Sequence, residues 1–430
     1  AAVNLSWCAY HFLMFINYSH CSPKRLLLSA LGLVALNSAC AQMNHSSHMG
    51  MGGSSKPANS CVSTGLECAN AATPFLDTDG SLFLVWTAGG VVSVAKSQDL
   101  GKSFTHTVVV AEHGKSLDAG GDARPQVVAD KNGNVFIAYA FFKDSNWNAQ
   151  VNMVRSVDGG KTFGQPQSIV SDASSQRFPS LAITPGGSLF LSWIDKRLVA
   201  AAKNNGEKRL GGSIAYAFSN DFGKTFQPEK IANENSCECC RIGAAADLKG
   251  GVAIIYRAIF PGGVRDHAIQ RISESNLGKI HRVSHDEWKT DACPHHGPSI
   301  TISQSGKIHT AWFTQGKARQ GVFYASSNND RLNFSSPMRL GGADDNISRP
   351  YLLAIGKSVW LVWKSFDGEK NSIYLRRSDD EGVTWTSPQV VVSAGGYSDH
   401  PLLVRQNDEV FLSWLTRNDG YQLIPLGGGK

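Results

Sequence analysis

The sequence predicts an all-β protein, and more narrowly a β-propeller of four-stranded antiparallel blades. The first observation is composition: glycine supplies 43 of 430 residues and charged residues only 18%, which is typical of turn-rich β proteins. The second is a template that recurs about every 50 residues, the spacing of propeller blades and solenoid repeats. The third is the alternation of apolar and polar residues within each copy, which predicts half-buried strands.

The N-terminal part of the chain is expected to lie outside this fold. Two basic residues precede the apolar run 26–36, and small residues follow, so residues 1–41 resemble a secretory signal with an upstream segment. The run is too short to span a bilayer. Cleavage after Ala41 would export the chain to the periplasm or the medium, with a lipid anchor at Cys40 as the alternative. Residues 42–60 would then form a flexible tail rich in Met and His.

Copies of the template fill residues 61–430, which we assign to the propeller. Each copy has a proline, replaced once by isoleucine, at the start of its first strand: Pro74, Pro125, Pro179, Ile242, Pro298, Pro350 and Pro401. An aromatic residue ends the second strand 12–14 residues later: Trp86, Tyr139, Trp193, Tyr256, Trp312, Trp363 and Trp414. We therefore favour seven blades, with six as the alternative. The last copy has room for about three strands, and residues near 60–70 are expected to supply its fourth.

The turn between the third and fourth strands reads Ser-x-Asp-x-Gly-x-Ser/Thr-Phe/Trp. It occurs at 97–104, 156–163, 219–226 and 378–385, with a degenerate form at 327–334. The Asp carboxylate can accept backbone N–H bonds, the Gly suits a left-handed position, and the aromatic ring can insert between blades. This pattern is the Asp-box, or BNR repeat, so the chain resembles the sialidase (neuraminidase) superfamily of propellers. Asp-boxes also occur on propellers that hydrolyse nothing. The motif therefore implies a propeller fold, and it does not by itself imply a hydrolytic activity.

Strand geometry predicts where a site would lie. The Asp-boxes occupy one face, and the starts of the first strands surround the central channel on the opposite face. The side chains at these starts are Arg124, Arg177, Cys240, Arg241, His295, His296, Arg349, Tyr397 and His400. The net charge of +6, from 41 Lys+Arg against 35 Asp+Glu, is too small to indicate nucleic-acid binding. The positive charge is therefore expected to act through its position at the channel.

Thiols and imidazoles on adjacent blades predict a soft-metal site at this channel mouth, which is our leading hypothesis from the sequence. The predicted ligands are Cys237, Cys239, Cys240, Cys293, His295, His296 and His400. Thiolate with imidazole suits copper or zinc. Three Met and two His within residues 43–51 favour copper, because thioethers bind Cu(I). Disulfides without metal are the alternative, for instance Cys293 with a blade-four cysteine and Cys61 with Cys68.

The resemblance implies a competing function, the hydrolysis of sialylated or other acidic glycans. Sialidases hold the substrate carboxylate with three arginines and use a Tyr–Glu nucleophile with an Asp acid/base. The segment that begins at Arg177 resembles the family's Arg-x-Pro segment, although it lies in the third copy rather than near the start of the propeller. Carried over, the catalytic residues would be Tyr397, Glu238 and Asp195 (or Asp122), and the carboxylate would contact Arg124, Arg177, Arg241 and Arg349. A non-catalytic glycan- or protein-binding propeller is the third hypothesis.

Overall fold

The computed structural model describes residues 61, 63–77, 79–290, 292, 294–327 and 332–429. The expected signal 1–41, the tail 42–60 and Cys293 lie outside the described residues. Among the residues that are described, there is no helix with the length and apolar character needed to cross a membrane.

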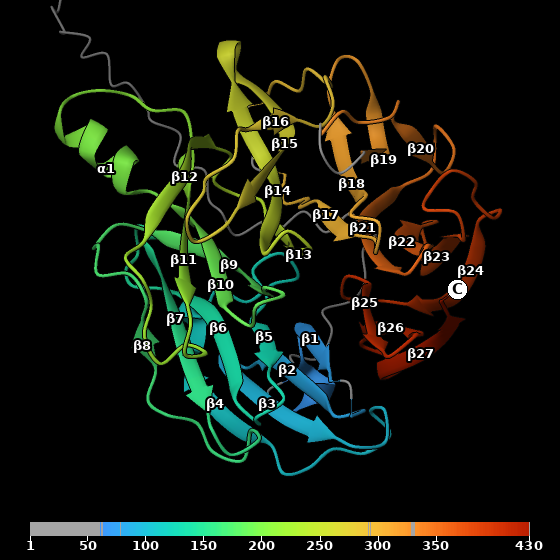
Figure 1. Cartoon of the computed structure of the whole chain (residues 1–430). Helices are drawn as coiled ribbons and strands as arrows, with labels where there is room; N and C mark the ends of the chain where they lie inside the picture. The colour runs from blue at the N-terminus through green and yellow to red at the C-terminus, as the bar shows by residue number, and fades with distance from the viewer. Residues whose placement is uncertain are drawn as a thin grey trace, which may run out of the picture. The chain divides into compact units, whose positions relative to one another are not determined.

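The predicted all-β propeller is confirmed: the described strands form antiparallel sheets in chain order (Figure 1). Blade 1 contains β1 (Ala71–Leu76), β2 (Leu82–Ala88), β3 (Val91–Ser97) and β4 (Val108–Glu112). Blade 2 contains β5 (Gln126–Ala129), β6 (Val135–Phe142), β7 (Ala149–Ser156) and β8 (Gln167–Ser168). Blade 3 contains β9 (Gln176–Ile183), β10 (Leu189–Asp195), β11 (Gly212–Ser219) and β12 (Lys230–Ser236).

Blades 4 to 7 continue this order. Blade 4 contains β13 (Gly243–Asp247), β14 (Gly251–Phe260), β15 (Val264–Ile272) and β16 (His281–Arg282). Blade 5 contains β17 (Ser299–Ile302), β18 (Ile308–Gln315), β19 (Gln320–Ser327) and β20 (Met338–Leu340). Blade 6 contains β21 (Ile347–Ile355), β22 (Ser358–Phe366), β23 (Lys370–Ser378) and β24 (Gln389–Gly395), and blade 7 contains β25 (Leu402–Gln406), β26 (Glu409–Thr416) and β27 (Gly420–Gly428). Blades 3 and 4 are joined by one residue pair, Ser236 with Ala258.

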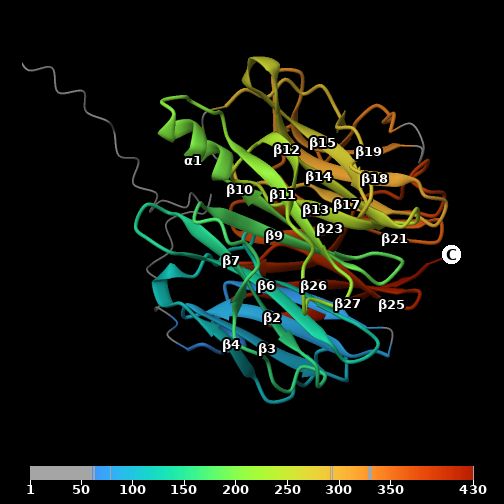
Figure 2. The ribbon, with the colours of Figure 1, turned by 60° about the vertical axis from the view of Figure 1, so that its left-hand side comes forward.

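The described part of the chain also contains four short helical segments. The helix α1 (Arg197–Asn204) lies in the connection from β10 to β11, at the edge of blade 3 (Figures 1 and 2). The 3-10 turns are η1 (Leu66–Cys68), η2 (Gly114–Ser116) and η3 (Pro261–Gly263).

The first strands of the blades line the centre of the ring. Each first strand contacts the first strand of the next blade, from β1 through β25, and β25 contacts β1 again. The seven aromatic residues predicted to end the second strands are all buried, at most 2% exposed. A separate apolar cluster fills the space between each pair of neighbouring blades, including one of Leu76, Leu82 and Phe411 between blades 1 and 7. Within the described residues the ring therefore closes with seven blades.

The turns between the third and fourth strands have the hydrogen bonds that the sequence predicts. Asp158 accepts bonds from the backbone N–H groups of Lys161 and Thr162, both at 3.0 Å, and from the Ser156 hydroxyl at 2.7 Å. Gly160 takes the left-handed conformation at φ 83°, where glycine has no steric penalty. The same network of Ser, Asp and Ser/Thr recurs at Asp99, Asp221 and Asp380.

The aromatic residue that ends each of these turns packs against the preceding blade. Phe226 of blade 3 contacts Phe136 of blade 2, with ring centroids 5.9 Å apart. Phe104 of blade 1 contacts Tyr421 of blade 7 at 6.2 Å. The same local motif therefore joins successive blades and also the first blade to the last.

The expectation that residues near 60–70 complete blade 7 is wrong. The described residues of this segment form the turn η1, closed by a disulfide between Cys61 and Cys68, and this turn contacts β2 and β27 without pairing as a strand. The Trp86 indole N–H donates to the carbonyl oxygen of Thr64 at 3.0 Å, which fixes the loop beside blade 1. Blade 7 thus has three strands among the described residues, and side-chain packing with blade 1 closes the ring.

Candidate functional site at the channel mouth

Polar and charged side chains from four blades (2, 4, 6 and 7) meet where the first strands begin. We call this group the mouth cluster, and it consists of Asp122, Arg124, Arg241, Arg349, Lys364, Asp399 and His400. Four of these residues, Arg124, Arg241, Arg349 and His400, were predicted from the sequence as binding or ligand residues. The structure brings these four together.

Arg124 and Asp399 form a buried pair between blades 2 and 7. Their side chains are 4% and 1% exposed, and two parallel hydrogen bonds of 2.6 and 3.1 Å join them. Asp399 also accepts the backbone N–H of Ala72 at 3.0 Å, in blade 1. The guanidinium of Arg124 further donates to the carbonyl oxygens of Gly121 and Ala72. This pair therefore ties together the three blades at which the ring closes.

Asp122 sits between two arginines from different blades. Arg241 of blade 4 donates to one carboxylate oxygen at 3.0 Å, and Arg349 of blade 6 donates to the other at 2.5 Å. Burial alone would raise the pKa of Asp122, but the charges of Arg349 and Arg241 outweigh it, so the pKa lies below its ordinary value. Asp122 is therefore an ionised carboxylate held by two guanidiniums.

His400 lies among these cations in its neutral form. Its Nδ1 is 3.4 Å from the guanidinium of Arg241, and a Cβ on Gly121 would lie 2.5 Å from the imidazole, so only glycine fits there. Burial, and then the charges of Arg349, Arg124 and Arg241, hold the pKa of His400 well below its ordinary value. A neutral imidazole can accept one hydrogen bond and donate another.

Lys364 lies near the end of β22, the second strand of blade 6, and donates to the carbonyl oxygen of Ser398 at 2.8 Å. Burial lowers its pKa to about 8, against the opposing effect of Asp399. The mouth cluster thus holds four cationic groups, Arg124, Arg241, Arg349 and Lys364, against two carboxylates. Four minus two leaves a net charge of +2 in the cluster, because Arg241 and Arg349 share the carboxylate of Asp122.

The backbone at Arg349 is strained. Its φ is 57°, in the left-handed region, next to Pro350 at a register shift between β21 and β22. A non-glycine residue in this region costs about 1–3 kcal/mol and is retained where the surroundings fix it. Here the guanidinium bonds to Asp122 and to the carbonyl oxygen of His295 fix it. In this backbone conformation the guanidinium of Arg349 reaches Asp122 in the mouth cluster.

Arg177, the remaining predicted arginine, lies outside the mouth cluster. It forms a bidentate pair with Asp118, with bonds of 2.7 and 2.9 Å. Its guanidinium also lies 4.5 Å from the ring centroid of Phe178 and 5.0 Å from that of Phe142. The predicted arginines therefore form one group of three and a separate arginine stacked on aromatic rings.

The three predicted catalytic residues have different partners in the structure. The Tyr397 hydroxyl donates to the carbonyl oxygen of Asn70, and the side chain is 46% exposed. Glu238 pairs with Lys196, and the buried Asp195 forms a bidentate pair with Arg197. Burial raises the pKa of the Tyr397 hydroxyl.

The blade-four cysteines form a buried thiol group. The Sγ atoms of Cys237 and Cys239 are 3.4 Å apart, and those of Cys237 and Cys240 are 4.0 Å apart. All three Sγ atoms lie within 4.8 Å of one another, and no disulfide joins any two of these three cysteines. Hydrogen bonds from Cys239 and Cys240 lower the pKa of the Cys237 thiol. The structure therefore brings together three of the seven predicted metal ligands.

The predicted histidine ligands lie in other settings. His296 stacks on Phe313 with ring centroids 4.1 Å apart, and burial lowers its pKa to about 3. The ring centroid of His295 lies 6.0 Å from that of Phe178. Within the described residues, the group of metal-ligating atoms around Cys237 contains no histidine.

Sequence reasoning missed three carboxylates and one lysine of this region. Asp122 was noted only as an alternative acid, and Asp118, Asp399 and Lys364 were not singled out. Asp399 directly precedes the predicted ligand His400, and Asp122 lies two residues before Arg124, which was the available signal. Their pairing with arginines up to 275 residues away is visible only in the fold.

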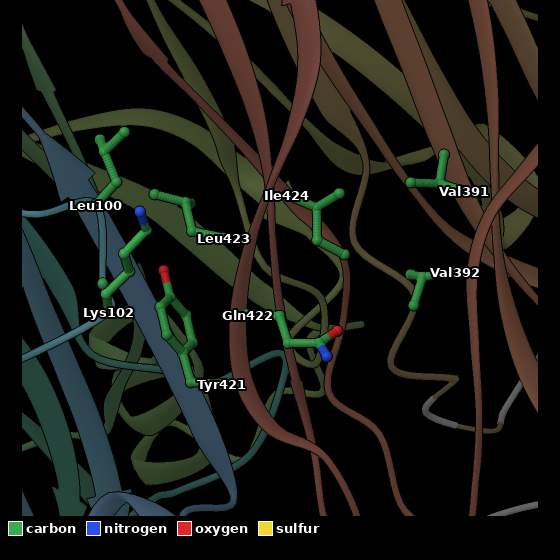
Figure 3. A pocket seen from close by; sticks show the side chains of 9 residues that line it. Leu100, Lys102, Val391, Val392, Tyr421, Gln422, Leu423 and Ile424 are labelled. Atoms are coloured by element: carbon green, nitrogen blue, oxygen red, sulfur yellow. The ribbon is translucent and has the colours of Figure 1, made fainter.

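A hollow of about 430 Å³ lies away from the mouth cluster. It is lined by the Asp-box turn of blade 1, β24 and β27: Leu100, Gly101, Lys102, Val391, Val392, Tyr421, Gln422, Leu423 and Ile424 (Figure 3). None of the predicted site residues lines it.

No family model and no curated protein matches the sequence. Among solved structures, a PL25 ulvan lyase bound to -[GlcA(1-4)Rha3S]- aligns with a TM-score of 0.55 at 10% identity, over 84% of this chain and 94% of that chain. A protein of unknown function from Dyadobacter fermentans aligns at 0.50 and 17% identity, over 72% and 92% of the two chains. The Hadza microbial sialidase Hz136 aligns at 0.49 and 14% identity, over 84% and 66%, which is too distant to bear on this chain. These likenesses show a propeller fold that is shared with carbohydrate-active enzymes.

Proposed function

We propose that this protein is a carbohydrate-active propeller that binds an acidic glycan at the mouth cluster. The observation that carries the proposal is the net charge of +2 in this cluster, where four cations face two carboxylates. An excess of buried positive charge is costly, so a site of this kind favours an anionic ligand. Arg241 and Arg349 already hold one carboxylate, that of Asp122, between two guanidiniums.

The chemical class of the ligand follows from the donors. Guanidinium groups bind planar carboxylates and sulfates through paired hydrogen bonds, and the neutral imidazole of His400 offers a partner for a sugar hydroxyl. The ulvan lyase that shares the fold was solved with a polymer of glucuronate and sulfated rhamnose. That likeness supports a uronate-containing or sulfated glycan as the first ligand to test, beside the sialylated glycans that the Asp-box resemblance implies.

The binding test compares two arginines of the same blade. Calorimetric titration with a glucuronate–sulfated rhamnose tetrasaccharide and with sialyllactose should give binding by the wild type. Arg349→Asn removes the charge at the mouth, and asparagine tolerates the left-handed backbone. We expect it to weaken binding roughly 10- to 100-fold, the value of one charged hydrogen bond. Arg377→Asn, which removes an arginine paired with Asp379 instead, is the matched control and should bind as the wild type does.

An equal effect of the two substitutions would contradict the placement of the ligand. Binding of neither glycan by the wild type would contradict the proposed function itself.

Hydrolysis is a finer proposal that rests on the sialidase resemblance. In it, Tyr397 is the nucleophile, Glu238 its partner and Asp195 the acid/base. The exposed side chain of Tyr397 could reach a substrate, and its hydroxyl would have to leave the carbonyl oxygen of Asn70 to act as the nucleophile. Release of a fluorogenic sialoside by the wild type and its loss in Tyr397→Phe would support the assignment. Binding of acidic glycan without any release of product would favour the non-catalytic glycan-binding propeller.

The thiol group favours a second candidate function, the binding of a soft metal, with copper preferred to zinc. Three thiols have Sγ atoms within 4.8 Å of one another, and thiolate sulfur is a soft ligand of the kind that selects Cu(I). Arg265 donates to the Cys237 sulfur at 3.5 Å, and the charge of Arg257 also acts on this thiol. Three thiolates and Cu(I) carry two negative charges, which these two arginines would balance.

A buried histidine lies near the thiols but outside the 4.8 Å group of their sulfur atoms, and it would have to shift to become a further ligand for zinc. His267 lies two residues from Arg265 along β15, so both side chains point to the same face of the blade. It is 1% exposed, and neither ring nitrogen has a hydrogen-bond partner among the described residues. Zinc in proteins takes four ligands, and three thiolates with one imidazole form a common set.

Metal analysis of the full chain tests this second candidate. We expect about one copper per chain, as a three-thiolate site would bind, and its loss in Cys237→Ser. His296→Gln serves as the control, because the His296 ring stacks on Phe313 and it should keep the copper. The disulfide alternative would be supported if the wild type contained neither copper nor zinc and also had fewer free thiols than the chemically reduced protein.

A further inference from the structure

A row of aromatic and guanidinium groups runs outward from the mouth cluster between blades 2 and 3. It begins at His295, whose carbonyl oxygen accepts a bond from Arg349, and whose ring centroid lies 6.0 Å from that of Phe178. The Arg177 guanidinium covers Phe178 at 4.5 Å and Phe142 at 5.0 Å. Phe142 in turn contacts Trp147 edge-on, with ring centroids 4.9 Å apart and planes at 87°.

The last member of the row is exposed. Trp147 is 54% exposed, whereas the seven repeat aromatics are buried. Its backbone is in the left-handed region at φ 63°, which is unusual for a bulky aromatic residue. Exposing an indole costs hydrophobic free energy, and the backbone adds strain, so neither feature serves the stability of the fold.

The connection that carries Trp147, between β6 and β7, is firmly held. Asp144 accepts the backbone N–H groups of Asn146 and Asn148 at 2.8 and 3.2 Å. Lys143 donates to the carbonyl oxygens of Ala173 and Ser174 of the next blade at 2.8 and 2.9 Å. The loop therefore presents the indole at a fixed position on the same face as the mouth cluster, because β6 ends and β7 begins there.

We propose that Trp147, at the outer end of this row, is a sugar-binding platform and that the ligand of the protein is a polymer rather than a single terminal sugar. The inference rests on the proposed function: the mouth cluster binds the acidic group, and Trp147 stacks on a more distant sugar ring of the same chain. The apolar C–H face of a pyranose suits an aromatic face, which carries negative charge above and below its ring. The edge-on contact with Phe142 leaves the indole in a set orientation.

Calorimetric titration with ligands of two lengths tests the platform. The probes are the glucuronate–sulfated rhamnose tetrasaccharide and free glucuronate. We expect Trp147→Ala to weaken tetrasaccharide binding roughly tenfold, the upper value for one aromatic contact, and to leave glucuronate binding unchanged. Trp147→Phe keeps an aromatic face and should stay within about threefold of the wild type. Val383→Ala, which alters another exposed apolar residue in the Asp-box turn of blade 6, is the control for surface substitution.

The outcomes separate this inference from the proposed function. Unchanged tetrasaccharide binding in Trp147→Ala, or equal weakening of both ligands, would overturn the platform and leave the mouth cluster in place. If the wild type binds neither the tetrasaccharide nor glucuronate, both the platform and the proposed function are overturned. A second readout is direct: the tetrasaccharide should change the tryptophan fluorescence of the wild type, and Trp147→Phe should lose most of that change.

Discussion

The two faces of the propeller handle charge in opposite ways. On the Asp-box face, the carboxylates lie at or near the surface and each accepts hydrogen bonds from its own turn, as Asp158 does from Ser156 and Thr162. At the mouth cluster the charges are buried, and their partners come from distant blades, as Asp399 and Arg124 do. The first pattern recurs from blade to blade, whereas the mouth cluster gathers side chains from four blades into one group. Residues that recur at the same position in successive blades build the fold. Residues that occur in only one blade at such a position are candidates for function.

The prediction with the largest expected effect concerns the free energy of unfolding, and its failure would contradict this comparison. Asp399→Ala leaves the buried guanidinium of Arg124 without its carboxylate and removes the bond to the backbone of Ala72. Loss of one partner of a buried ion pair costs about 3–5 kcal/mol, so we expect the free energy of unfolding to fall by that amount. Urea unfolding at neutral pH, followed by tryptophan fluorescence, measures it. A loss below 1 kcal/mol, the value typical of a surface pair, would show that the pair does not hold blades 1, 2 and 7 together.

A smaller effect concerns ligand binding and pH. Burial lowers the pKa of Lys364 to about 8, so this group carries its charge at pH 7 and loses most of it by pH 9. Because the protonated amine attracts an anion, affinity for the acidic tetrasaccharide should fall by up to roughly tenfold over that interval. Titrations at pH 7, 8 and 9 measure the change.

The matched variant for this prediction is Lys364→Met, which should bind more weakly at pH 7 and show little further change up to pH 9. An identical pH profile in the variant would show that another group controls binding.

The smallest effect is expected on the Asp-box face. Asp158→Asn keeps the shape of the side chain but weakens the hydrogen bonds it accepts from Thr162 and Lys161. Its partners remain exposed to water, which can replace the lost bonds, so unfolding should shift far less than in Asp399→Ala. Glycan binding should be unaffected. An equal loss of stability in the two variants would contradict the contrast between the faces.

Local signals in the sequence were sufficient for the fold. A proline before the first strand and an aromatic at the end of the second act within one blade, so Pro125 and Tyr139 mark blade 2 without reference to the rest of the chain. The prediction of a fourth strand near residues 60–70 was wrong, and the reason is also local. The disulfide between Cys61 and Cys68 closes that segment into a turn, and a short closed loop cannot extend along β27.

The candidate site was predictable only in part. Position at the start of a first strand identified Arg241, Arg349 and His400, because propeller geometry directs these residues to one face. The same position did not distinguish Arg177 from the arginines of the mouth cluster, although Arg177 pairs with Asp118 and stacks on Phe142 instead. Nor did it reveal Trp147, because an isolated tryptophan in a connecting loop carries no periodic signal.

The most direct test of the account is a crystal structure of the full protein soaked with the glucuronate–sulfated rhamnose tetrasaccharide. The account predicts an acidic group of the ligand within hydrogen-bond distance of Arg241 or Arg349, and a neighbouring sugar ring on the face of Trp147. A ligand bound instead in the hollow between β24 and β27, or on the Asp-box turns, would contradict the central claim that function resides at the mouth cluster.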